Sequence, residues 1–297
     1  MPNPALDVTV WRSNPAPISA LGRAGVELIK KWACTLDRMG RDRGAATASK
    51  RGKMAVYSEA RYPHPWGFWA TTGWALLSFT AAMLVAMGCA AVWRSLHPGQ
   101  TLTGALSGPL LLVCTAAAAP VQIGLLALAA RLRHWPAGKY LGLTPLQGRW
   151  FALGVVCLVI ALPTLDLLTH LIGEPIASSF QIESYVSARA AGWLPLLWLT
   201  FAVIAPAAEE ITFRGFLYRG WAASRLGIFG AILLTSAIWS LLHIQYDWVI
   251  ILQIFGIGLM LGCFRWLSGS TSLTIILHAL MNFWGLLETI VTIEGLS

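Results

Sequence analysis

Two adjacent carboxylates end an apolar stretch in the sequence IAPAAEEITFRGFLYRG, which runs from Ile204 to Gly220. Glu210 and Arg214 are four residues apart, which on a helix is the separation of an ion pair. Glu209 comes one residue earlier and therefore points about 100° away around the helix. Because two carboxylates at low dielectric raise each other's proton affinity unless a cation intervenes, the pattern indicates one structural acid, Glu210, and one acid that is free for chemistry, Glu209.

Two histidines follow on later apolar stretches, and Asn282 lies four residues after His278. The turn between the stretches of Glu209 and His243 is expected near Leu226, seventeen residues from each. At a rise of 1.5 Å per residue both side chains then lie about 25 Å from the turn, at one level. A carboxylate beside an imidazole can take a proton from water. By the same calculation His278 falls short by about two helical turns, so its helix must be offset or its turn must lie deeper.

The residues around these groups are those of a membrane protein. Apolar residues make up 57% of the chain and charged residues 11%, whereas an ordinary soluble domain has about 25% charged residues. A helix needs about 20 residues to cross a bilayer. The sequence therefore predicts an all-α polytopic membrane protein with about seven transmembrane helices, near residues 67–93, 105–130, 150–172, 191–212, 228–246, 248–264 and 271–292.

The basic residues indicate the direction of the chain across the membrane. Eleven of the 21 Lys and Arg residues precede Tyr62, and eight more follow the second, fourth and sixth stretches. The alternate loops keep only Arg94 and Arg189. By the positive-inside rule, the N-terminus is expected in the cytoplasm and the C-terminus outside. This distribution accounts for the net charge of +8 as a topology signal, without a nucleic-acid partner.

The sequence divides into three parts. Residues 1–62 form a basic arm, in which an amphipathic helix over 18–39 is predicted to lie on the anionic membrane surface and a linker follows over 43–53. Accessory transmembrane helices are expected over 63–190, with Asp166 as a hydrogen-bonding residue between helices. Most ionisable groups within the membrane gather in a core over 191–297. Such groups cost about 2.5–3.5 kcal/mol each to insert, which favours a functional role.

The motifs of this core resemble those of the CAAX-protease and bacteriocin-processing (CPBP, Abi) family of intramembrane endopeptidases, which is related to the type II CAAX prenyl endopeptidases. That family has the patterns EExxxR, FxxxH and HxxxN on successive helices. Here they read Glu209-Glu210-Ile211-Thr212-Phe213-Arg214, Trp239-Ser240-Leu241-Leu242-His243 and His278-Ala279-Leu280-Met281-Asn282. The likeness covers about residues 200–290. Trp239 replaces the usual Phe, a change that affects the shape of the cavity more than the chemistry.

The resemblance implies hydrolysis of a peptide bond in a membrane-associated protein or peptide. It implies that Glu209 and His243 activate a water molecule, and that His278 and Asn282 stabilise the oxyanion. Glu210 and Arg214 would hold the site together, and Trp239 would form its wall. The resemblance and the composition also favour the inner membrane of a bacterium. The substrate stays open among prenylated C-termini, leader peptides and sorting tags.

Three alternatives follow from the same residues. Members of the family are often called metalloproteases, and Glu209, His243 and His278 can supply three zinc ligands with a fourth position for water. The sequence has no HExxH motif and the calculated level of His278 opposes a shared ion, so a site without metal is favoured and zinc is the alternative. Polar groups within helices also form proton pathways in transporters, although no internal repeat is visible. A non-catalytic membrane scaffold is the third alternative.

Overall fold

The computed structural model describes residues 62–99 and 108–295, and within them all regular elements are helical. Six helices have the length and composition to cross a membrane, which confirms the predicted all-α polytopic membrane fold. They are α3 (Phe68–Leu96), α5 (Pro109–Leu132), α7 (Gly148–Leu171), the composite helix Leu194–Ala222, α13 (Trp248–Ser268) and α14 (Thr271–Glu294). The predicted arm helix and linker lie outside the described residues.

The fifth predicted span, near residues 228–246, is shorter than expected. Helix α12 (Gly227–Leu241) has 15 residues, and the chain then forms a loop up to Asp247, whose side chain accepts hydrogen bonds from the first amides of α13. The prediction of a helix through residue 246 was therefore wrong at its C-terminal end. The polar sequence HIQYD from His243 to Asp247 ends the helix, and His243 lies just beyond it.

The composite helix changes its winding twice around the paired acids. Its segments are α9 (Leu194–Leu199), the π-helical η1 (Thr200–Ile204), α10 (Ala205–Glu210), the π-helical η2 (Ile211–Leu217) and α11 (Tyr218–Ala222). Short π-helical segments are frequent at functional sites. The predicted span near 191–212 left Arg214 in the following turn, which was wrong, because the helix continues through η2 and α11. Arg214 is fully buried within the helix, because its charge is paired there.

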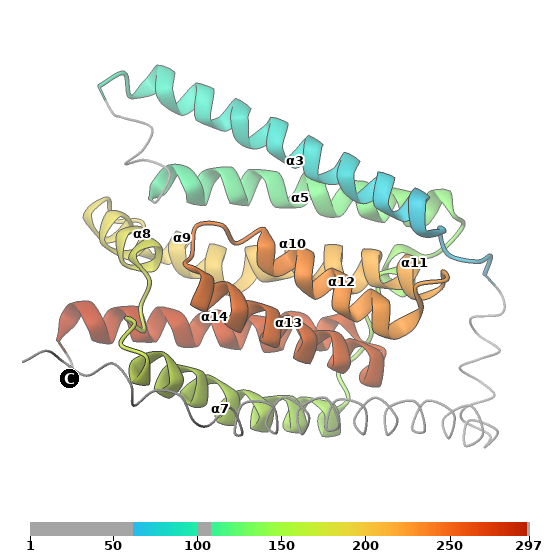
Figure 1. The fold of residues 1–297 in the computed structure, drawn as a ribbon. Coiled ribbons are helices and arrows are strands. Elements are labelled where there is room, and N and C mark those ends of the chain that lie inside the picture. Colours follow the sequence, from blue (N-terminus) through green and yellow to red (C-terminus); the bar gives the residue numbers. More distant parts are fainter. Residues whose placement is uncertain (1–61, 100–107, 296–297) are drawn as a thin grey trace, which may run out of the picture. The chain divides into compact units, whose positions relative to one another are not determined.

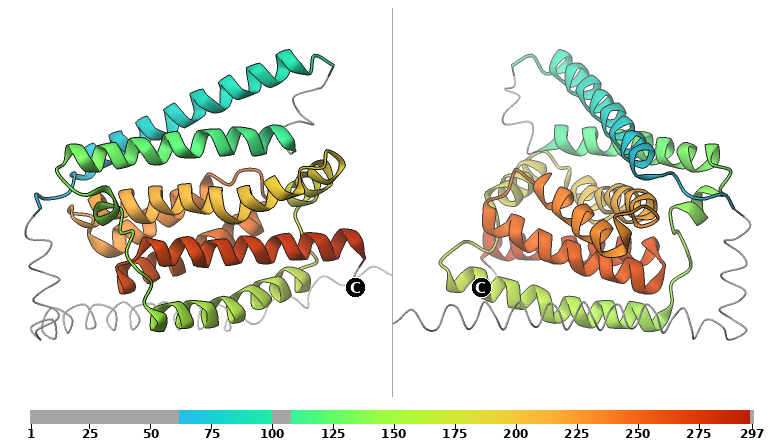
Figure 2. Two further views of the ribbon diagram at one scale, coloured as in Figure 1. Left: turned by 180° about the vertical axis from the view of Figure 1, so that it is seen from behind. Right: turned by 45° about the vertical axis from the view of Figure 1, so that its right-hand side comes forward.

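The core lies among the composite helix, α12, α13 and α14, with α3 and α5 along one side and α7 along the other (Figures 1 and 2). Its largest buried side chains include Phe213, Trp239, Leu261 and Leu277. The outer faces of α3 and α7 carry exposed large apolar side chains, as expected for helices that face lipid. The buried core therefore coincides with the helices that carry the candidate motifs.

The turn between α13 and α14 lies deep in the helix bundle. Gly269 ends α13 with φ of 73°, and Arg265, four residues earlier, donates from Nε to the backbone carbonyl of Arg214 over 2.9 Å. Gly269 is four residues beyond Arg265, so the turn lies about 6 Å beyond the level of Arg214. Glu209 is five residues before Arg214, which is about 7.5 Å in the other direction. The sum matches the roughly 13 Å from Gly269 to His278, so a deeper turn, and not an offset helix, brings His278 to the level of Glu209.

Candidate active site

The Glu210–Arg214 ion pair forms the base of the site. Arg214 Nη1 lies 2.9 Å from Glu210 Oε1, and the two side chains are 1% and 0% exposed. The guanidinium also donates from Nη2 to the carbonyl of Gly258 over 3.2 Å and stacks on the Trp239 ring, 4.4 Å from its centroid. A buried ion pair is tolerated only when further hydrogen bonds satisfy its charges. These contacts make the pair a structural support between the composite helix, α12 and α13.

Glu209 points away from this pair, as the helical spacing predicts, and its side chain is 30% exposed. Its Oε2 accepts a hydrogen bond of 2.6 Å from Trp239 Nε1. The same oxygen lies 3.9 Å from His243 Nε2 and 4.0 Å from His278 Nε2. One carboxylate oxygen and two imidazole nitrogens from three separate segments therefore face a common point.

The partners of each imidazole determine which nitrogen carries a proton. His243 Nδ1 lies 2.8 Å from the carbonyl of Trp239, and a carbonyl only accepts hydrogen bonds, so Nδ1 is the protonated nitrogen. In the neutral ring His243 Nε2 then has a free lone pair directed at Glu209. The loop position of His243 contributes to this geometry, because the last helical carbonyls of α12 lack intrahelical partners.

His278 is fixed by the acid that was expected to serve only Arg214. Its Nδ1 lies 3.1 Å from Glu210 Oε1, and since this neighbour is a carboxylate, Nδ1 donates the proton. Glu210 therefore orients the imidazole as well as the guanidinium. No pattern in the sequence indicates this second contact, because residues 210 and 278 are joined only through the tertiary structure.

Asn282 has a structural partner that follows from the winding of η1. In this segment the Ala205 amide bonds to the carbonyl of Thr200, five residues back. The matching partner of the Phe201 carbonyl would be the nitrogen of Pro206, which carries no hydrogen. Asn282 Nδ2 donates to this carbonyl instead, over 2.8 Å. One of its two amide hydrogens is thus used within the protein, and one remains for another acceptor.

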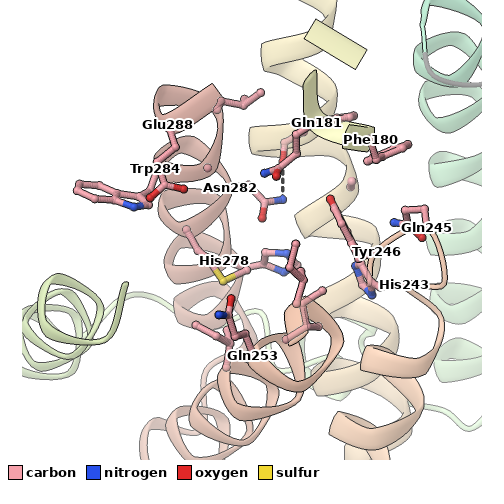
Figure 3. A pocket seen from close by; sticks show the side chains of 18 of the residues that line it. Phe180, Gln181, His243, Gln245, Tyr246, Gln253, His278, Asn282, Trp284 and Glu288 are labelled. Carbon is pink, nitrogen blue, oxygen red and sulfur yellow. Dashed lines mark hydrogen bonds between the residues drawn. The ribbon is translucent and has the colours of Figure 1, made fainter. Parts of the chain in front are cut away.

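A cavity of about 320 Å³ joins these groups. Glu209, Trp239, His243, His278 and Asn282 all line it, whereas Glu210 and Arg214 do not. Figure 3 shows His243, His278 and Asn282 around this space, with Phe180 and Gln181 of α8 (Ser179–Ala190) at its edge. Residues of α8, Tyr246, Asp166 and Glu288 also line the cavity, although no sequence motif predicted them as site residues.

Tyr246 adds a neutral hydroxyl to the wall, because burial raises the pKa of its phenol above the usual value and the nearby Glu209 raises it further. The Tyr246 ring stacks on His243, with 6.1 Å between the centroids. Phe180 packs edge-on against Tyr246 at 5.6 Å. The α12–α13 loop is therefore held over the site by aromatic contacts. In the sequence, the one sign of this contact is the position of Tyr246, three residues after the motif histidine His243.

The proposed zinc ligands do not have the spacing of a zinc site. Tetrahedral zinc with bonds of about 2.0–2.1 Å holds its donor atoms about 3.4 Å apart, whereas Glu209 Oε2 lies 3.9 Å and 4.0 Å from the two Nε2 atoms. The Glu209 oxygen also accepts the short bond from Trp239. Among residues 62–99 and 108–295, no group of three or more His, Cys, Asp or Glu side chains is arranged to hold a metal ion.

Residues 191–284 match the family model of the type II CAAX prenyl endopeptidase Rce1-like proteins. The match covers less than half of the 297 residues, but it contains all three motifs. It confirms the family resemblance for this segment and points to a peptidase. Neither a curated protein nor a solved structure matches the chain.

Proposed function

We propose that the protein is an intramembrane endopeptidase that hydrolyses a peptide bond in a membrane-associated protein or peptide without a metal ion. The observation that carries the proposal is the approach of two imidazole Nε2 atoms to one oxygen of Glu209, at 3.9 Å and 4.0 Å, inside a cavity within the helix bundle. The peptidase match of residues 191–284 supports the reaction class.

Glu209 and His243 act as the general base. A water molecule bound at about 2.8 Å can contact Glu209 Oε2 and His243 Nε2 together, because these atoms are 3.9 Å apart. Both atoms accept hydrogen bonds, so they draw the protons of the water and leave its oxygen lone pair for the scissile carbonyl carbon. The proton taken from the water then returns to the leaving nitrogen. The Trp239 bond holds Glu209 in place during both transfers.

His278 and Asn282 face the carbonyl oxygen of the substrate. Asn282 has one amide hydrogen left after its bond to Phe201. His278 donates from Nε2 only when both ring nitrogens carry protons, since Nδ1 already donates to Glu210. Donors aimed at a developing oxyanion in a water-poor site are worth roughly 3–4 kcal/mol each. The role of Glu210 is to orient and balance the charge of His278.

The test is cleavage of a library of membrane-anchored peptides by the purified protein in lipid nanodiscs. The wild type is expected to cleave, and Glu209→Gln and His243→Ala are expected to be inactive with unchanged thermal unfolding. Glu183→Gln, the same change on the exposed face of α8, is the matched control. Cleavage by Glu209→Gln at the rate of the wild type would refute the proposed base.

The location completes the proposal. Six apolar helices make this a multi-pass membrane protein, and we assign it to the inner membrane of a bacterium with a cytoplasmic N-terminus. The basic loops after α5 and after the composite helix support this orientation. Labelling of single engineered cysteines by an impermeant reagent in intact cells tests it. A cysteine in the loop 173–178 is expected to react, and one in the loop 141–147 is not.

A further inference from the structure

We propose that the end of the cavity at Asp166 and Glu288 is a subsite for a cationic side chain, lysine or arginine, of the peptide substrate. This inference rests on the proposed peptidase function. It concerns a part of the cavity that lies outside the three motifs. Asp166 comes from α7, and Glu288 comes from the C-terminal third of α14.

The two carboxylates meet across the α7–α14 contact. Trp284, one turn before Glu288, donates from Nε1 to Asp166 Oδ2 over 3.2 Å. The carboxyl groups of Asp166 and Glu288 are hydrogen-bonded to each other, so the pair shares a proton and carries one negative charge. Both residues line the cavity. None of the salt bridges among the described residues includes either of them. A half-buried pair of acids that has no basic partner in this part of the chain is a complementary site for a cation.

The charges of the whole cavity lining favour the same ligand. The chain has 21 Lys and Arg residues against 13 Asp and Glu residues, yet no Lys or Arg is among the described residues that line the cavity. Besides the Tyr246 hydroxyl, its ionisable side chains are three carboxyl groups and two imidazoles: Asp166, Glu209, Glu288, His243 and His278. Low-dielectric walls strengthen the field of such a lining, so it attracts a positive group and repels a negative one.

A fully buried hydroxyl without a partner among the described residues also belongs to the wall of the cavity. Thr200 of η1 lines the cavity and is 0% exposed. Its Oγ1 has no hydrogen-bond partner within the described part of the chain. Buried polar groups are nearly always paired, so a fully buried hydroxyl without a partner in a cavity wall is suited to a group that arrives with the substrate. A peptide backbone offers both a donor and an acceptor.

The length of α14 places the subsite relative to the proposed chemistry. Glu288 follows His278 by ten residues, which is about 15 Å along the helix. An extended peptide covers at most about 3.3–3.6 Å per residue, so 15 Å corresponds to about four residues. The structure therefore assigns the cation to a position within about four residues of the bond that is cleaved.

The structural alternative is that the acid pair only joins α7 to α14 through Trp284. Asp166→Asn and Glu288→Gln separate the two roles, because the amide oxygens still accept hydrogen bonds while the negative charge is lost. A joining role depends on the hydrogen bond and survives the double substitution. A cation subsite depends on the charge and does not survive it. Glu183→Gln on α8 removes one carboxylate outside the cavity and serves as the control.

The test measures binding and cleavage separately. The probes are two palmitoylated, fluorescent decapeptides of Gly, Ala and Leu that differ in one residue, lysine or norleucine, and their affinities are measured by anisotropy in detergent micelles. The wild type and Glu183→Gln are expected to bind the lysine peptide at least tenfold more tightly, about 1.4 kcal/mol. Asp166→Asn/Glu288→Gln is expected to bind both peptides equally, with thermal unfolding unchanged.

Three outcomes would overturn the subsite. They are no binding of the lysine peptide, equal affinities in the wild type, and a lysine preference that persists in the double variant. Cleavage of a mixed peptide library adds an independent measurement, in which Lys and Arg are expected to be enriched within about four residues of the cleaved bond. A protein that binds with this preference but cleaves nothing would contradict the peptidase proposal and leave the subsite standing.

Discussion

Substitution of the two adjacent acids by glutamine is expected to separate stability from activity: Glu210→Gln lowers the thermal stability, and Glu209→Gln lowers the rate of cleavage. The Glu210 side chain is 0% exposed and pairs with Arg214, which is 1% exposed. Glu210→Gln keeps the shape of the side chain but leaves a buried guanidinium without its counter-charge, which costs about 3–5 kcal/mol. For a unit of about 150–250 residues each kcal/mol lowers Tm by about 2–4 °C, so the expected fall is about 6–20 °C.

Glu209→Gln is expected to leave stability nearly unchanged. The Glu209 side chain is 30% exposed, and the amide oxygen of glutamine still accepts the hydrogen bond from Trp239. Such a change at a partly exposed site is worth about 0.5 kcal/mol or less. Its effect falls on catalysis, because an amide does not accept the proton of the attacking water.

The assay is thermal unfolding of both variants in one detergent, with cleavage measured on the same preparations. Glu210→Gln/Arg214→Met is the control, since removing both charges together is expected to restore most of the lost Tm. Equal losses of Tm in Glu209→Gln and Glu210→Gln would refute the division of roles between the acids. So would a Glu210→Gln variant as stable as the wild type.

Further predictions concern the other groups of the site. Trp239→Phe keeps an aromatic ring at this position but removes the Nε1 donor to Glu209; a hydrogen bond to a charged group is worth about 1.5–3 kcal/mol, so kcat is expected to fall roughly 10–150-fold. Tm is expected to fall as well, because Trp239 is 1% exposed and its smaller replacement leaves a cavity beside Arg214. Treatment with a strong zinc chelator followed by its removal is expected to leave activity intact, whereas a lasting loss that Zn²⁺ restores would establish the zinc alternative.

Contacts between residues close in sequence were predictable because helical geometry determines them. The spacing of Glu210 and Arg214 predicted their ion pair, and the even distances from Leu226 predicted the common level of Glu209 and His243. The calculation succeeded for His243 although α12 ends before it, because two residues of loop change the rise little. The apolar stretches predicted six helices that are long enough to span the membrane, whereas the predicted span near 228–246 corresponds to the 15-residue helix α12.

Contacts that depend on tertiary structure were not predictable. The level of His278 depends on the depth of the α13–α14 turn, which the bond between Arg265 and the Arg214 carbonyl maintains. The hydrogen bond from Asn282 to the Phe201 carbonyl requires the π-helical winding before Pro206. This winding makes Phe201 the residue whose carbonyl has no amide partner at the proline. Such effects depend on packing and leave no periodic signal in the sequence.

The acidic end of the cavity was missed for a related reason. Glu288 lies within the predicted span 271–292 and within α14, but nothing in the sequence pairs it with another acid. Its partner Asp166 lies on α7, which is adjacent to α14 in space but far from it in sequence. Only the packing of these two helices shows that the two acids share a cavity.

The most direct measurement of the central claim is the rate at which purified Glu209→Gln cleaves a membrane-anchored peptide that the wild type cleaves. Loss of a general base is expected to lower this rate by about 10²–10⁴-fold, while the peptide still binds. A rate within tenfold of the wild type would show that Glu209 is not the base, and the assignment of the water-activating site would be wrong.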